Sequence, residues 1–167
     1  MKWSDFLLMI SAVVFSVAAT AEPIAPLAPL NDFGKQAFAA EGKTEADMEN
    51  DIPPKDLVGI PPYPGSYFGS SMSANDELSS VTLMSEDSAE KVVAWYQKEL
   101  GNEWQYVPEL ATSQMNEVGV FVNTDNEAIS AMDALRHKQI RISKVEKPED
   151  TGFVAMMFDV KGMNSMI

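Results

Sequence analysis

The side chains that could carry out acid–base, nucleophilic or metal chemistry are few and scattered in this sequence. The 167 residues include one histidine, His137, and no cysteine. A serine–histidine–aspartate triad would have to use His137, but no Gly-x-Ser-x-Gly turn marks a nucleophile. His137 lies between Arg136 and Lys138, which is typical of a surface residue. A zinc site would need at least two carboxylates from distant segments, and no phosphate loop or dinucleotide fingerprint occurs. We therefore predict no catalytic residue, no metal site and no cofactor.

Carboxylates, in contrast, are abundant. The chain has 25 Asp and Glu residues against 12 Lys and Arg, a formal net charge of −13. An acid pair can cleave glycosides, so a small periplasmic hydrolase with a carboxylate site is our alternative hypothesis for function. Asp47-x-Glu49-x-Asp51 and Asp125-x-Glu127 lack the glycine and the distal glutamate of a calcium loop, and are typical of solvated acidic segments. The charge also repels phosphate, so we expect neither nucleic acid nor an anionic membrane surface as a partner.

Methionine is the third residue type with possible chemistry. The chain has 11 of them, and Met163-x-x-Met166 could bind Cu(I) through its thioethers. Met156 and Met157 are adjacent, but neighbouring residues of a strand point to opposite faces. We therefore expect no copper site.

An aromatic cluster offers a binding surface rather than a reactive one. Tyr63, Tyr67 and Phe68 surround the turn signal Pro64-Gly65. One hypothesis makes these three rings an exposed platform for a sugar or a peptide. The other makes them a cover for the edge of a sheet. The predicted binding residues are Tyr63, Tyr67 and Phe68.

The elements that must position these residues are organised around the stretch 79–107. Its apolar run Val81–Met84 predicts a strand. Asp87 then predicts a helix N-cap with Glu90 three residues later. Apolar residues at helical spacing predict a main helix from Asp87 to Leu100, ended by a left-handed cap at Gly101. The stripe consists of Ala89, Val92, Val93, Tyr96 and Leu100.

Alternating and apolar segments predict the remaining strands. They span residues 65–72 and 78–85 as a hairpin, then 104–107, 117–123, 139–145 and 153–160. A possible second short helix within 126–135 carries Ala128, Ile129, Met132 and Leu135. The expected fold class is α+β: a two-layer sandwich with a mainly antiparallel sheet of about five or six strands and the main helix across one face.

The N-terminal part predicts export. Lys2, an apolar run from Phe6 to Ala18 and the small residues Ala19-Thr20-Ala21 form a signal peptide over 1–21. An uncleaved anchor is the alternative; after cleavage we expect no membrane span. Residues 22–59 are predicted to be a proline-rich and acidic, partly disordered linker, with short helices beginning near Asn31 or Asp32 and at Thr44. A single domain spans 60–162, and 163–167 form a tail.

Two motifs carry a resemblance. Tyr63-Pro64-Gly65, a strand, and then Asp87-Ser88-x-Glu90-x-Val92-x-x-Trp95-Tyr96 with Leu100 and Trp104 resemble small exported bacterial proteins and lipoproteins of uncharacterised function. The resemblance implies a compact α+β domain in a cell-envelope setting and brings no catalytic residue. We therefore predict a non-enzymatic periplasmic or secreted domain that binds an envelope protein, peptide or glycan.

Overall fold

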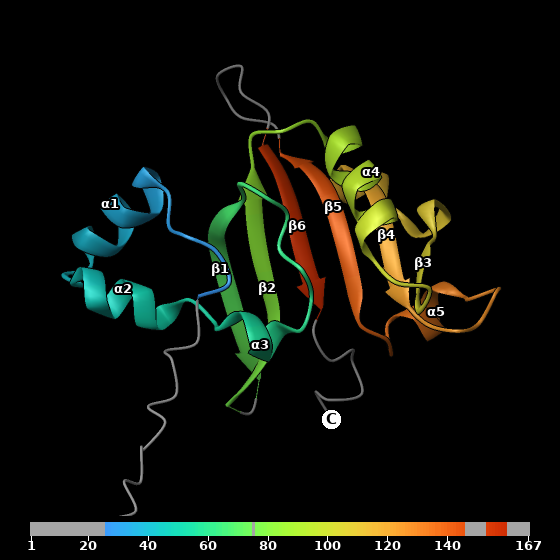
Figure 1. The fold of residues 1–167 in the computed structure, drawn as a ribbon, viewed down its shortest axis with the longest axis horizontal. Coiled ribbons are helices and arrows are strands. Elements are labelled where there is room, and N and C mark those ends of the chain that lie inside the picture. The colour runs from blue at the N-terminus through green and yellow to red at the C-terminus, as the bar shows by residue number, and fades with distance from the viewer. Residues whose placement is uncertain (1–25, 75, 146–152, 160–167) are drawn as a thin grey trace, which may run out of the picture.

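A six-stranded antiparallel sheet forms the centre of the molecule (Figure 1). The computed structural model describes residues 26–74, 76–145 and 153–159. The strands are β1 (Tyr67–Ala74), β2 (Glu77–Ser85), β3 (Trp104–Tyr106), β4 (Glu117–Asn123), β5 (Gln139–Val145) and β6 (Phe153–Asp159). The α+β class with an antiparallel sheet, predicted from the alternation of apolar residues, is confirmed.

The order of the strands in the sheet is β1-β2-β6-β5-β4-β3. β1 and β2 form the expected hairpin, and the chain then crosses to the opposite edge of the sheet through a helix. β3, β4 and β5 return step by step, and β6 fills the place between β5 and β2. Met156 on β6 accordingly pairs with Leu83 on one side and Ile142 on the other.

Five α-helices and two 3₁₀ turns surround the sheet in the described part of the chain. They are α1 (Asp32–Ala40), α2 (Glu45–Asp51), α3 (Lys55–Val58), α4 (Ala89–Glu99), α5 (Ala131–Ala134), η1 (Pro108–Leu110) and η2 (Ser113–Met115). Figure 1 shows α4 and α3 in front of the sheet, with α1 and α2 beyond its β1 edge. Within residues 26–74, 76–145 and 153–159, none of the helices has the length and apolar character needed to cross a membrane.

The main core lies between the sheet and α4. The period of two along each strand points alternate side chains at the helix, and α4 supplies Val92 and Tyr96 from its apolar stripe. Tyr96 is fully buried, and its hydroxyl donates a hydrogen bond of 3.2 Å to the Pro61 carbonyl. The fully buried strand residues facing α4 are Val81, Leu83, Ile140, Ile142, Met156 and Phe158.

The ends of α4 differ from the sequence prediction. Ser88, not Asp87, is the N-cap, and its hydroxyl accepts a hydrogen bond of 3.3 Å from the Lys91 amide. The prediction for Asp87 was wrong because Asp87 and Ser88 are both residue types that cap helices, and the Asp87 carboxylate instead contacts Tyr63 and Lys91. The helix ends at Glu99, and its C-cap Leu100 is extended and only half-buried, so the predicted end at Leu100 with a left-handed cap at Gly101 is also wrong.

The described part of the predicted linker, residues 26–59, contains three short helices. Asn31 caps α1 by accepting a hydrogen bond of 2.8 Å from Gly34, and α2 begins with a capping box at Thr44, as the sequence indicated. Leu27, Ile52 and Val58 are buried with the main core. This stretch therefore packs against the sheet domain. The predicted signal peptide, 1–21, and the tail, 163–167, lie outside the described residues.

The second helix predicted from the sequence is present but shorter. α5 covers Ala131–Ala134, with Ser130 as its N-cap. Ala134 is buried, whereas Met132 is 73% exposed. One turn of helix buries only one narrow side, so most of the residues named for this helix stay outside the core.

Candidate binding groove

A groove of about 560 Å³ lies between α1 and the β1–β2 end of the sheet. The helix contributes residues spaced three or four apart, which therefore share one face. The strands contribute the floor. Cavities of roughly 300–1,000 Å³ are typical of sites for small molecules. The lining consists of Asn31, Gly34, Ala37, Phe38, Glu41, Tyr67, Phe68, Gly69, Ser70, Thr82 and Met84.

A bulge in β1 shapes the floor of this groove. The register shifts between Phe68 and Ser70, which leaves Gly69 as the extra residue. A Cβ atom on Gly69 would lie 3.1 Å from the Thr82 carbonyl oxygen and 3.2 Å from Met84 Cγ. The backbone oxygen cannot move away without disturbing the ladder, so only glycine fits here without a local shift.

The three aromatic residues predicted for binding occupy different environments. Tyr67 is half-buried and lines the groove. Burial raises the pKa of its hydroxyl, and the negative charge of Glu86 adds to this shift. Tyr63 and Phe68 are each only 4% exposed and belong to the main core, the role that the edge-cover alternative expects. Phe68 also borders the groove but is almost fully buried, so Tyr67 is the most exposed of the three rings and the main candidate contact residue.

Tyr63 anchors the turn that precedes β1. Its ring meets Trp95 of α4 edge to face at 5.4 Å, and its hydroxyl donates a hydrogen bond of 2.8 Å to Asp87. Asp87 also pairs with Lys91 at 2.7 Å. The Lys91 ammonium and then the Tyr63 hydroxyl lower the pKa of Asp87, while burial raises the pKa of Tyr63. These contacts fix the start of β1, and with it the position of Tyr67.

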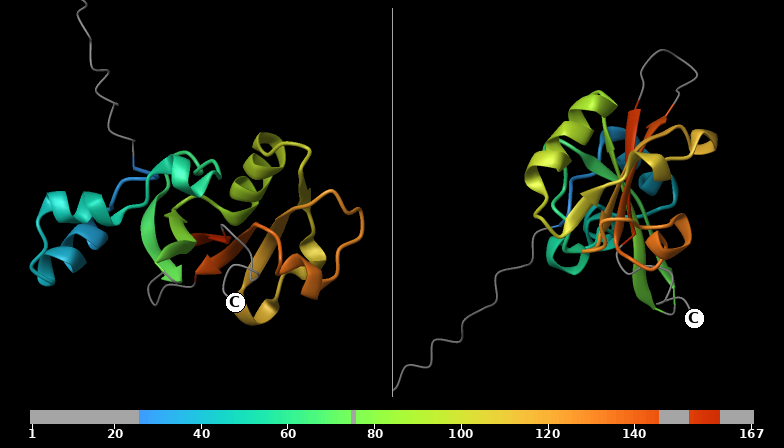
Figure 2. Two further views of the ribbon diagram at one scale, coloured as in Figure 1. Left: turned by 90° about the horizontal axis from the view of Figure 1, so that it is seen from below. Right: turned by 90° about the vertical axis from the view of Figure 1, so that its right-hand side faces the viewer.

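The sheet face opposite α4 continues from the groove across the centre of the sheet. Thr82, Met157 and Arg141 are neighbours across β2, β6 and β5, and each is half-buried. Figure 2 shows α4 and α5 on opposite sides of the sheet. Near β4 this second face is covered by a smaller apolar cluster around Val120, Val122 and Ala134.

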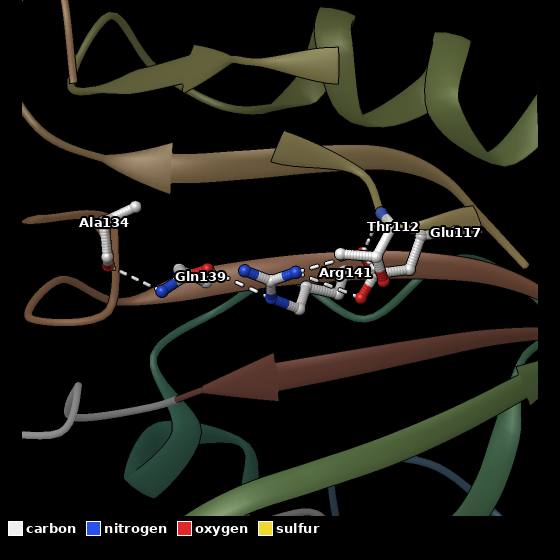
Figure 3. A network of polar contacts seen from close by, with 5 residues as sticks. All are labelled: Thr112, Glu117, Ala134, Gln139 and Arg141. Carbon is white, nitrogen blue, oxygen red and sulfur yellow. Dashed lines mark hydrogen bonds and ion pairs between the residues drawn. The ribbon is translucent and has the colours of Figure 1, made fainter. Parts of the chain in front are cut away.

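A polar network on that second face ties β4 and β5 to the preceding loop (Figure 3). Arg141 Nη1 donates to both carboxylate oxygens of Glu117 at 3.0 Å, and Arg141 Nε donates to Gln139 Oε1 at 3.1 Å. Gln139 in turn donates to the Ala134 carbonyl. The Thr112 amide and hydroxyl donate to Glu117 at 2.7 and 3.1 Å. The Glu117 side chain is 1% exposed, and Arg141 balances its charge inside the protein. The hydrogen bonds from Thr112 to Glu117 hold the preceding loop in place.

The sequence analysis did not single out Glu117 or Arg141. Both lie in strands that it predicted, and a charged residue in an alternating strand can always face solvent. Their pairing depends on the register of β4 against β5, where a bulge between Glu117 and Gly119 brings Glu117 opposite Ser143. No local pattern in the sequence reports that register.

The acidic segments considered for cations have simple structural roles. Asp47 completes the capping box of α2, and Asp51 pairs with Lys43. Among residues 26–74, 76–145 and 153–159, no three His, Asp or Glu side chains come together as metal ligands. Glu109 and Glu127 line a second hollow of about 510 Å³ beside η1.

The methionines and the histidine complete the set of candidate residues. Met156 is buried against α4 and Met157 is half-buried on the other face, as the strand pattern predicted. Met163 and Met166 lie outside the described residues. His137 follows α5 and donates its backbone N–H to the Ala134 carbonyl at 3.0 Å.

A scan of protein-family models, a search of curated proteins and a search of solved structures each found no match to this chain.

Proposed function

We propose that this protein is a non-enzymatic, exported domain of the cell envelope that binds a segment of a partner protein or peptide in the groove between α1 and β1–β2. The observation that carries the proposal is the groove itself, about 560 Å³ in volume and lined mainly by nonpolar side chains and glycines. Tyr67 forms part of its wall. Aromatic residues of this kind give a large contact area for little loss of conformational entropy.

The chemistry of the lining favours a nonpolar side chain as the occupant. Ala37, Phe38 and Met84 surround the space, and the polar groups beside them are few. A nonpolar group gains roughly 25 cal/mol for each Å² of apolar surface that leaves water. Nonpolar side chains and glycines form the larger part of the lining, so among the predicted partner classes we favour a peptide with a nonpolar residue.

The charge around the groove favours a cationic residue next to that nonpolar side chain. Glu41 lies in the lining, where Lys43 pairs with it at 3.8 Å, and Glu86 is close enough to raise the pKa of Tyr67. Lys43 Nζ also lies 4.5 Å from the centre of the Phe38 ring, so the preference for a cationic residue comes from Glu86 and from the net charge of the chain. The whole chain carries a formal charge of −13. Complementary charge speeds encounter and selects among partners more than it adds affinity.

The location of the protein is inferred from the sequence over 1–21. A charged start, an apolar run and a small-x-small site support export to the periplasm or the medium. Mass spectrometry of the protein purified from its host should show a chain that begins at Glu22. A chain with an intact Met1 would contradict this part of the proposal.

The binding site is tested by filling it. Ala37→Trp places a large ring in the groove, whereas Ala39→Trp adds the same ring to another face of α1 and is the matched control. A random peptide library selected on the wild-type protein should yield sequences with a nonpolar residue beside Lys or Arg. These peptides should bind the Ala39→Trp protein and fail to bind the Ala37→Trp protein. Equal binding to both variants would show that the groove is not the site.

A further inference from the structure

The outer edge of β1 presents backbone groups to solvent. β1 is the edge strand of the sheet and pairs with β2 on its inner side alone. At its start, the Phe68 amide donates a hydrogen bond of 2.8 Å to the Pro29 carbonyl. Among the residues that the structure describes, none makes a backbone hydrogen bond to the outer side of residues 69–74.

The contact between Pro29 and Phe68 shows how this edge accepts an extended chain. Phe68 pairs with Leu83, and Ser71 pairs with Val81. Leu83 and Val81 are two residues apart on β2, so their partners direct their backbone groups to the same side. Phe68 directs its amide outward, and Ser71 therefore does so too. The position at Phe68 is occupied from within the chain, whereas no backbone group of the described residues occupies the position at Ser71.

The side chains of this edge do not protect it. Natural edge strands often carry lysine, proline or inward-pointing charges that prevent a further strand from adding. Residues 69–74 read Gly-Ser-Ser-Met-Ser-Ala and contain none of these. Bulges next to Gly69 and between Met72 and Ser73 do limit strand addition, so only a short segment can pair with the regular part between them.

We propose that an extended, cationic segment of a partner adds to β1 as a further strand along residues 69–74 and places one nonpolar side chain in the groove. The inference rests on the proposed function, because the groove supplies the side-chain site. Gly69 and Ser70 belong to both the edge and the groove lining, so one extended chain reaches both. In such strand addition, main-chain hydrogen bonds supply affinity and pockets for alternate side chains supply specificity.

A second copy of this chain is the other possible occupant, and its chemistry fits less well. Two copies would bring together formal charges of −13 each, which repel. The edge offers mostly small side chains, with Met72, 66% exposed, as its one large nonpolar group. A cationic partner segment is attracted by the negative charge of this chain and can also place a nonpolar side chain in the groove.

The probe is a fluorescein-labelled octapeptide with alternating threonine and leucine and a lysine at each end. Its binding to the protein is followed by fluorescence anisotropy. N-methylation of alternate amides in the probe should weaken binding by roughly tenfold or more, because the methyl groups block the main-chain hydrogen bonds. Ser71→Pro removes the outward N–H and should weaken binding similarly, whereas the matched Ser71→Ala should not. Replacing both lysines by glutamate should also weaken binding.

The outcomes separate the two proposals. If Ala37→Trp abolishes binding while N-methylation and Ser71→Pro leave it unchanged, the groove function stands and strand addition is overturned. If the octapeptide does not bind the wild-type protein, or binds Ala37→Trp equally well, strand addition at this site is overturned, and the library selection still decides the groove function. Should circular dichroism show that Ser71→Pro is unfolded, the N-methylated probe decides. Light scattering that shows a dimer disrupted by Ser71→Pro would instead assign the edge to a second copy.

Discussion

The Tyr63 hydroxyl donates a hydrogen bond of 2.8 Å to the Asp87 carboxylate, which joins the turn before β1 to the start of α4. The ring itself is buried against Trp95. Tyr63→Phe keeps the ring and loses the hydrogen bond, so it should lower the melting temperature by a few degrees. Tyr63→Ala also loses the ring and should cost roughly 3–5 kcal/mol. Tyr67→Ala, at the groove wall, should leave thermal unfolding by circular dichroism nearly unchanged. Equal losses from Tyr63→Ala and Tyr67→Ala would contradict these assignments.

The same hydrogen bond predicts a pH dependence. Lys91, and to a smaller extent Tyr63, hold the pKa of Asp87 below its usual value. Unfolded aspartate titrates near pH ~3.9, so the ionised carboxylate adds stability above that pH. This contribution is lost as the pH falls through the lower pKa of the folded state. The difference in urea midpoint between wild type and Tyr63→Phe should therefore shrink below about pH 4. Tyr106→Phe is the control, because Tyr106 is 36% exposed. If the difference for Tyr63→Phe persists at low pH, the assignment is refuted.

Substitutions at two leucines test which part of the core contributes more to stability. Leu83 on β2 is fully buried, whereas Leu100 at the end of α4 is half-buried. Leu83→Ala should lower the free energy of unfolding by roughly 2–5 kcal/mol, and Leu100→Ala should cost clearly less, because less surface returns to water. Urea unfolding measures both. A larger loss at Leu100 would mean that the helix end packs more tightly than the structure shows.

The N-cap of α4 can be tested without disturbing the core. Ser88→Ala removes the side-chain acceptor for the Lys91 amide and should cost about 0.5–2 kcal/mol. Ser88→Gly should cost only a few tenths of a kcal/mol, because glycine is itself tolerated at N-caps. Chemical denaturation of the two variants in parallel gives the comparison. Equal losses would indicate that the serine hydroxyl does not cap the helix.

The pair Glu117 and Arg141 should behave as a coupled unit. Arg141→Met leaves the Glu117 carboxylate, whose side chain is 1% exposed, without its cation, and should cost roughly 3–5 kcal/mol. Adding Glu117→Gln to this variant should recover part of the loss, since no buried charge then remains unpaired. A double-mutant cycle by urea unfolding measures the coupling. Strictly additive losses would show that the two side chains act independently.

Much of the fold could be predicted from the sequence because local patterns determine it. The alternation in residues 139–145 predicts β5 with its observed bounds, since one face of that strand packs on α4 and the other is half-open. The hairpin of β1 and β2 follows from two strand-like segments, 65–72 and 78–85, around a short polar connection. The caps at Asn31 and Thr44 depend on neighbours three residues away. Such features need no knowledge of the rest of the molecule.

The candidate groove could not be predicted in the same way, because its walls come from segments that meet only in three dimensions. Tyr67 was identified as an aromatic residue near a turn, and nothing local distinguishes it from Tyr63, whose ring is buried. The contribution of Ala37 depends on α1 lying beside β1 and β2. The choice between Asp87 and Ser88 as N-cap likewise depends on a tyrosine 24 positions away.

The place of β6 between β2 and β5 has a consequence for how the chain acquires its structure in time. Among the strands that the structure describes, only β6 hydrogen-bonds to both the β1–β2 hairpin and the β3–β4–β5 group. Until residues 153–159 have been synthesised, none of these strands joins the two groups. A polypeptide synthesised only as far as residue 152 therefore holds two separate pieces of sheet. Closing the sheet then requires contacts between residues about 70 positions apart, such as Leu83 with Met156, and such distant contacts are slow to form. The ribosome must accordingly produce nearly the whole domain before the complete sheet can form cooperatively.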